Sequence, residues 1–236
     1  MRYTRQELKH DKFADTAADA LHWTAAHRQK LITAGIAVAI VILLAVGAFW
    51  YMNHRNQGAT VELGKALATY NAPIRPEGAP ADPNMLSFAS PKERATAAKA
   101  EFDKVGGNYE STQSGQMAKY FSALCDEDLG NTQGAEQGLK ALTSVRNADV
   151  AALSKFALAS LYRDANRETD AVNVYKDLIA HPSRTVPKTT AQMELAAVYA
   201  TKQPAEAKKI YQEIAKEDPK GPAAEMAAQR EAALKQ

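Results

Sequence analysis

One uninterrupted apolar segment dominates the hydrophobic pattern of the chain. Residues 31–52 read LITAGIAVAIVILLAVGAFWYM and contain no Asp, Glu, Lys, Arg or His. A helix of this length extends about 33 Å, enough to cross a hydrocarbon core of roughly 30 Å. The pattern predicts a transmembrane helix at 31–52, with Trp50 and Tyr51 as an aromatic anchor at one membrane interface.

The distribution of basic residues around this segment predicts its orientation. Six Lys and Arg residues precede it within the first thirty positions, whereas only Arg55 and Lys65 follow within twenty positions of Met52. The positive-inside rule then places the N-terminus in the cytoplasm and the C-terminal domain outside. A cleaved signal peptide is the alternative, because small residues near position 47 resemble a cleavage site, but the segment is longer than the 7 to 15 residues of a signal core.

Two further segments flank the predicted span. Residues 1–30 open with a capping box, Thr4 to Glu7, and continue with apolar residues at helical spacing, which predicts a cytoplasmic amphipathic helix. It lies on the inner membrane surface, docks on a partner, or is simply a solvated extension of the span. Residues 53–89 predict a short helix at 60–70 and then a linker at 72–89, where four prolines disfavour regular structure.

From residue 90 onward an apolar triplet recurs with one spacing, Ala-x3-large-x2-apolar. A second capping box, Ser90 to Glu93, opens the first helix that carries it. The alanines are 37, 36 and 36 residues apart, which chance rarely produces. The four triplets are Ala98/Phe102/Val105, Ala135/Leu139/Leu142, Ala171/Tyr175/Leu178 and Ala207/Tyr211/Ile214.

The helix before each triplet repeats as well. Leu158-Ala159-x2-Tyr162 precedes the third triplet, and Leu195-Ala196-x2-Tyr199 precedes the fourth. Small residues at these places let two helices approach closely, and the large residue one turn later fills the groove between them. The pattern predicts an all-α domain at 90–236, an α-solenoid of about three and a half helical hairpins, ending in a capping helix at 222–235.

The repeated unit resembles the tetratricopeptide repeat (TPR), whose pattern includes Leu-Gly/Ala-x2-Tyr followed by Ala, a large aromatic residue and a closing Pro. The first-helix tryptophan is absent, Asp126 stands where an aromatic residue is expected, and the period exceeds 34. The layout also resembles single-pass bacterial inner-membrane proteins with a periplasmic tetratricopeptide-like domain, such as the ancillary subunit family of the SecYEG translocon. That resemblance implies a periplasmic scaffold near the translocation or envelope chaperone machinery, and it carries over no site residues.

Composition and motifs argue against several functions. A formal charge of +2 and the lack of a basic, aromatic-rich stretch speak against nucleic acid. The single cysteine, Cys125, excludes an intramolecular disulfide and lies among apolar residues, which predicts a buried structural thiol. No nucleophile, phosphate-loop or metal motif is present, and His181 lies at a helix end. We therefore expect no enzyme, cofactor or metal site.

Function is then expected from the surface of the stacked hairpins. Such stacks bind extended peptides or partner helices on the face built from the first helices. Self-association through the repeat ends or the predicted span is an alternative. One hypothesis is a membrane-tethered scaffold that recruits other proteins; the other is a structural accessory subunit held mainly through residues 1–55. The candidate partner-binding residues are Gln116, Lys119, Lys155, Arg163, Gln192 and Glu194.

Overall fold

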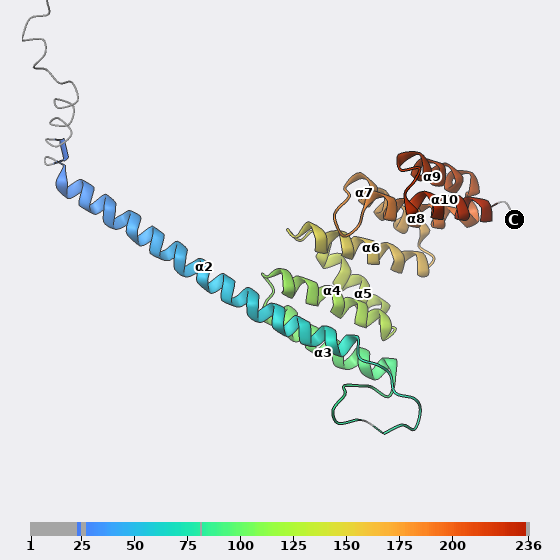
Figure 1. Cartoon of the computed structure of the whole chain (residues 1–236), viewed down its shortest axis with the longest axis horizontal. Helices are drawn as coiled ribbons and strands as arrows, with labels where there is room; N and C mark the ends of the chain where they lie inside the picture. Colours follow the sequence, from blue (N-terminus) through green and yellow to red (C-terminus); the bar gives the residue numbers. More distant parts are fainter. Residues whose placement is uncertain (1–22, 25–26, 81, 235–236) are drawn as a thin grey trace, which may run out of the picture. The chain divides into compact units, whose positions relative to one another are not determined.

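The structure, a computed structural model, describes residues 23–24, 27–80 and 82–234. Within these ranges it is all-helical apart from an isolated β-bridge between Ile74 and Phe88, so the predicted all-α fold is confirmed. The amphipathic helix predicted for 1–30 lies almost entirely outside the described residues. The helices, coloured along the chain in Figure 1, are α2 (Arg28–Tyr70), α3 (Pro91–Asn108), α4 (Gln113–Asp128), α5 (Thr132–Leu142), α6 (Ala148–Asp164), α7 (Glu168–Ala180), α8 (Lys188–Lys202), α9 (Pro204–Glu217) and α10 (Pro222–Ala233).

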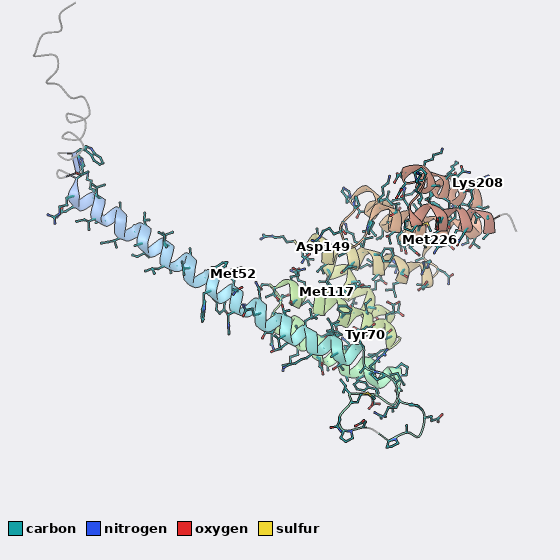
Figure 2. All side chains as sticks on the ribbon, viewed as in Figure 1. Met52, Tyr70, Met117, Asp149, Lys208 and Met226 are labelled. Atoms are coloured by element: carbon teal, nitrogen blue, oxygen red, sulfur yellow. The ribbon has the colours of Figure 1, made fainter. Side chains whose placement is uncertain are left out.

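The chain divides after His54 into two units, and the first contains the apolar part of α2. Side chains of this part, up to Met52, project from one helix in Figure 2. Leu43 and Phe49 are 71% and 73% exposed, and the first buried residue of α2 comes only at Ala59. Among the described helices, α2 alone is long and apolar enough to cross a membrane.

The second unit, Arg55–Gln236, begins inside α2. The helix predicted at 60–70 is the end of α2 rather than a separate element, because no proline interrupts the chain before Pro73. This end packs on α3. The Thr69 hydroxyl donates a hydrogen bond to Glu101 (3.0 Å), and the rings of Tyr70 and Phe102 meet edge to face, with centroids 6.0 Å apart. The end of α2 therefore supplies the first helix that the predicted half repeat lacked.

The proline-rich segment is a closed loop between α2 and α3. The Arg75 N–H donates to the Phe88 carbonyl (2.8 Å), and the Phe88 N–H donates to the Pro73 carbonyl (3.1 Å). The Arg75 guanidinium also donates to the Ser87 carbonyl (2.6 Å). The prolines exclude helix as predicted, but the chain returns to its starting point, so the segment joins two helices of one hairpin (Figure 1).

The recurring triplets lie on the second helix of each hairpin, α3, α5, α7 and α9, and all twelve residues are buried. Each alanine allows the neighbouring helix to approach, and the large residue fills the space one turn later. The predicted hairpins are therefore confirmed as α4–α5, α6–α7 and α8–α9. The helix α10 packs on the last of them, where Ala227 joins a cluster with Tyr211 and Ile214.

The turns inside two hairpins share one geometry. Gly130 and Asn166, 36 residues apart, both have positive φ, 78° and 59°. The next residue closes the turn in both hairpins: the Asn131 N–H donates to the Asp126 carbonyl (2.8 Å), and the Arg167 N–H donates to the Tyr162 carbonyl (2.7 Å). Asparagine and glycine are the residues that adopt this conformation at least cost. The repeat thus extends from the apolar positions to the backbone of the turns.

Candidate functional site

Four of the six residues predicted to contact a partner make contacts within the stack. Lys155 on α6 pairs with Asp177 on α7, with Nζ and Oδ2 2.6 Å apart. Arg163 on α6 and Glu194 on α8 pair with each other across two hairpins at 2.7 Å. Gln192 is only 2% exposed, and its Oε1 has no hydrogen-bond partner among the described residues. The structure thus brings Arg163 and Glu194 together and buries Gln192.

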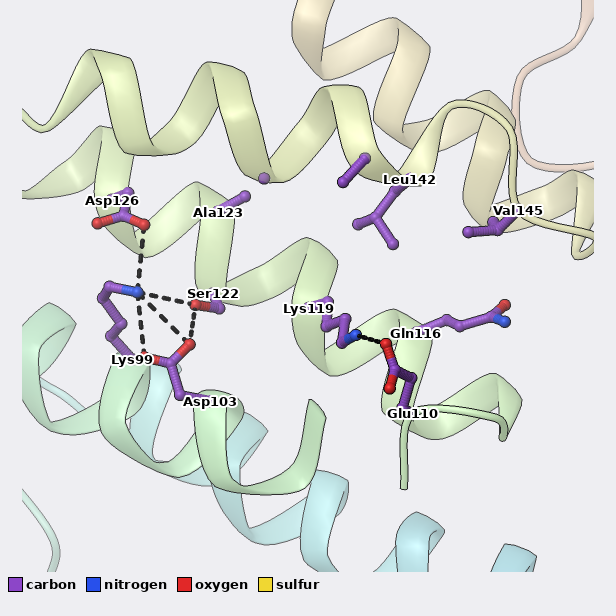
Figure 3. Close-up of a pocket in the computed structure, with 12 residues that line it drawn as sticks. Lys99, Asp103, Glu110, Gln116, Lys119, Ser122, Ala123, Asp126, Leu142 and Val145 are labelled. Atoms are coloured by element: carbon purple, nitrogen blue, oxygen red, sulfur yellow. Dashed lines mark hydrogen bonds and ion pairs between the residues drawn. The ribbon is translucent and has the colours of Figure 1, made fainter. Parts of the chain in front are cut away.

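The other two residues, Gln116 and Lys119, line a pocket of about 480 Å³. Its walls come from the second helices α3 and α5 as well as from α4, so it does not belong to the first helices alone (Figure 3). A volume of this size falls in the range of ligand-binding clefts. We call it the α3–α5 pocket. It is lined by Lys99, Asp103, Glu110, Gln116, Lys119, Ser122, Ala123, Asp126, Gly138, Ala141, Leu142 and Val145.

One end of the pocket is a saturated charge cluster centred on Lys99. Its Nζ lies 3.1 Å from both Asp103 and Asp126 and 3.0 Å from the Ser122 hydroxyl, as the dashed lines in Figure 3 show. Burial alone lowers the pKa of Lys99, but the hydrogen bonds with Asp103 and Asp126 outweigh it, and the pKa is raised. This ammonium stays charged and fully engaged, and it fixes α3 against α4.

The opposite end carries Lys119, whose position is set by a glycine. The Lys119 Nζ pairs with Glu110 in the connection between α3 and α4, and this hydrogen bond lowers the pKa of Glu110. A Cβ built on Gly106 of α3 would come within 2.8 Å of the Lys119 Cγ. The aliphatic stem of Lys119 therefore lies directly against the α3 backbone, where only glycine leaves room.

Between the two ends, the wall from α4, α5 and the residues after α5 is apolar. Ala123 and Leu142 are buried there, while Ala141 is exposed toward solvent and Val145 is half-buried. Gly138 permits a close approach of α5 to α4, because a Cβ at this position would lie 2.9 Å from that of Ala123. These residues offer an apolar surface beside the Lys119 ammonium.

One polar atom in the pocket is unsatisfied. The Oε1 of Gln116 is buried and accepts no hydrogen bond from the described residues. A buried acceptor without a donor costs about 1–3 kcal/mol, so such an atom is normally paired in a working state of a protein. The pocket thus combines a positioned cation with an apolar wall, and the residue pattern of α4 alone does not predict this combination.

The structure gives no support to chemistry at these groups. Burial raises the pKa of the Cys125 thiol to about 12, with a further contribution from Asp128, so the nucleophilic thiolate is scarce at neutral pH. In the part of the chain that the structure describes, no group of three or more His, Cys, Asp or Glu residues is placed to hold a metal ion.

Comparisons with known proteins bear on the fold. No family model matches the chain, and no curated protein matches it. Among solved structures, a putative kinesin light chain from Podosopora anserina with nearly identical TPR-like repeats is similar with a TM-score of 0.50 and 17% identity. The match covers 60% of this chain and 77% of that one, and a variant of the same protein matches equally. The helical stack of this chain therefore has a TPR-like fold.

Proposed function

We propose that this protein is a membrane-anchored scaffold that binds other proteins through its TPR-like stack. The observation that carries the proposal is the α3–α5 pocket, an open site for a side chain within a fold that commonly binds proteins. The exposed apolar part of α2 supplies the anchor. Lys119 and Gln116 line this pocket and are the proposed contact residues, whereas Lys155, Arg163 and Glu194 are already paired within the stack.

The proposed location is the inner membrane of a bacterium, with the N-terminus in the cytoplasm and the second unit in the periplasm. The support is the excess of Lys and Arg before residue 31 and the resemblance of the layout to ancillary translocon subunits. Components of protein translocation or envelope chaperones are accordingly the first partners to seek.

Topology is tested with cysteines introduced separately at His10 and Asn84. A membrane-impermeant maleimide added to spheroplasts is expected to label Cys at 84, which lies in the exposed loop after α2, before lysis. It should label Cys at 10 only after lysis. The native Cys125 is buried and contributes little background. Labelling in the reverse order overturns the proposed orientation, and labelling of both sites before lysis argues against a membrane span.

Scaffolding is tested in the full chain with a photo-crosslinking residue at Ala141, inside the pocket. The matched control is Gln137, one turn earlier on α5 and outside the pocket. We expect a defined crosslinked partner in native membranes from position 141 and not from 137. A second variant replaces 31–52 with an unrelated apolar span. If that replacement abolishes the complex while Lys119→Gln leaves it intact, the protein is an accessory subunit held by its anchor.

A further inference from the structure

The hairpins α4–α5 and α6–α7 can be compared position by position, because their triplets are 36 residues apart. Lys119 and Lys155 then occupy the same place on α4 and α6. In the later hairpin, Lys155 pairs with Asp177 of α7 at 2.6 Å. The position matching Asp177 in α5 is Ala141. The position on α5 that matches the partner of Lys155 is therefore an alanine, which cannot pair with Lys119.

Lys119 pairs instead with Glu110 of the same chain, a carboxylate that another anion can readily displace. Glu110 lies outside the helices, and its side chain is 74% exposed, compared with 40% for Asp177. Exposed ion pairs contribute little, because water and salt screen them and two long side chains must be ordered. The Lys119 stem, by contrast, is held against α3 at Gly106. The cation is thus positioned, while its anion is replaceable.

The charges around the pocket limit where a second anion can bind. At the far end, the two carboxylates of Asp103 and Asp126 share one cation, Lys99. That end therefore has a net negative charge and repels an anion. Beside Lys119, the pocket is lined by the apolar side chains of Leu142 and Val145. An occupant that fits carries a carboxylate and an aliphatic group.

We propose that the α3–α5 pocket binds an acidic side chain, Asp or Glu, of a partner protein. The carboxylate takes the place on Lys119 that Asp177 takes on Lys155. An aliphatic residue next to it in the partner lies on Leu142 and Val145. This inference rests on the proposed scaffold function and names the chemistry that the scaffold recognises.

The test is a library of random peptides displayed between two fused segments, so that no peptide has a free C-terminus. It is selected on the full chain in lipid nanodiscs. We expect enrichment of peptides with Asp or Glu within four residues of Val, Leu or Ile, and at least a tenfold loss of their affinity when Asp or Glu becomes Asn or Gln. Enrichment of basic peptides, or no enrichment, overturns the proposal.

Matched variants locate the site. Lys119→Gln is expected to weaken the selected peptides at least tenfold, whereas Lys155→Gln, at the equivalent position already paired within the chain, leaves affinity unchanged. Ala141→Asp supplies the missing carboxylate from α5 and should block binding, while Gln137→Asp adds the same charge outside the pocket and should not. Circular dichroism verifies that each variant is folded. Equal effects of the two lysine variants, or undiminished binding by Ala141→Asp, overturn the proposal.

The two proposals fail in different ways. If crosslinking from position 141 captures a partner whose crosslinked segment has no acidic residue, the scaffold stands and the acidic recognition is wrong. If position 141 captures nothing and the library is not enriched, both are wrong.

Discussion

Two boundaries between hairpins of the stack carry ion pairs of opposite polarity. At the first, the cation is Lys99 on α3 and the anion is Asp126 on α4, 3.1 Å apart. At the second, the anion is Glu136 on α5, and the cation is Arg167 before α7, 2.9 Å apart. Lys99 and Glu136 occupy the same register position, since each follows the first alanine of its triplet.

The difference shows which features of the repeat are fixed and which are free. The apolar triplets must recur, because they fill the same space between every pair of helices. The polar position beside each triplet needs only a residue of opposite charge on the next hairpin. If α5 took the place of α3 at the first boundary, Glu136 would replace Lys99 beside Asp126, and two carboxylates would meet. Alternating polarity therefore favours one order of stacking over others.

The surroundings of the two pairs also differ. Asp126 is 9% exposed and accepts a further hydrogen bond from Asn131 (2.9 Å). Arg167 is more exposed, and its guanidinium lies 4.1 Å from the centroid of the Tyr162 ring. At the third boundary the equivalent position is Val172, which lines a small pocket of about 170 Å³. The ion pair there, Glu168 with Lys202 at 2.8 Å, lies one helical turn earlier.

The largest expected effect concerns the large buried residue of the triplet, which occupies an equivalent position at both boundaries. Phe102→Ala and Leu139→Ala each remove a fully buried large side chain and should lower the free energy of unfolding by about 2–5 kcal/mol. Urea unfolding followed by circular dichroism measures this, because both tryptophans precede residue 55 and do not report on the stack. Met85→Ala, at an exposed site, should change the free energy by less than about 0.5 kcal/mol. A neutral result at either core position would break the equivalence of the hairpins.

The next largest effect should distinguish the buried ion pair of Lys99 and Asp126 from the more exposed pair of Glu136 and Arg167. Asp126→Ala removes the acceptor of both Lys99 and Asn131 and should cost about 1–3 kcal/mol of unfolding free energy. Glu136→Ala, at the more solvated boundary, should cost less. The same urea titrations measure both. A larger loss for Glu136→Ala would contradict the ranking of the two boundaries by burial.

A charge swap sharpens the comparison of polarity. Arg167→Glu should lower Tm, because it places a carboxylate beside Glu136 and Asp170. Adding Glu136→Arg should restore part of the loss, since the boundary then has the polarity of Lys99 and Asp126. Thermal unfolding at low salt measures the three variants. If the double variant is no more stable than Arg167→Glu alone, the polarity of this boundary is not exchangeable.

The smallest effect concerns Lys155 and Asp177. The hydrogen bond from Lys155 lowers the pKa of Asp177 below its ordinary value of 3.8. A lowered folded-state pKa stabilises the protein above the unfolded-state value, and this contribution is lost as pH falls through the folded-state pKa. Lys155→Gln should therefore be slightly less stable than the native chain at pH 6, and the gap in stability should narrow as pH falls below about 4. A gap that is unchanged at pH 2 would exclude the ion pair as its cause. Lys119→Gln is the matched comparison, because it removes the equivalent lysine, whose ion pair with Glu110 is more exposed and should contribute less to stability.

Much of the fold could be predicted from local pattern. The twelve triplet positions, the capping box at Ser90 and the apolar segment 31–52 each depend on residues a few positions apart. The Ser90 hydroxyl accepts from the Glu93 N–H at 3.1 Å as the pattern predicts. The continuation of the span into the first hairpin was missed, although the absence of proline before Pro73 was a signal for it.

The candidate site was predicted only in part. The pattern identifies polar residues of the first helices only by position, yet Gln192 is buried and Lys155 is paired with Asp177, while Lys119 lines the pocket. An alignment of the repeats places Ala141 at the position of Asp177, and this is the signal that the sequence offers. The place of Gly106 under the Lys119 stem had no signal in the pattern, because it depends on a contact between separate helices.

The sequence by itself determined the helices, their period and the apolar face that each buries, because these follow from the spacing of neighbouring side chains along one helix. The tertiary structure alone decided which charges pair and where an open site remains. Ion pairs between helices, such as Lys99 with Asp126 and Lys155 with Asp177, join residues more than twenty positions apart, at distances set by how closely the helices approach. A change of one glycine or alanine at that approach, as at Gly106 or Ala141, determines whether a lysine is covered or left open to a partner.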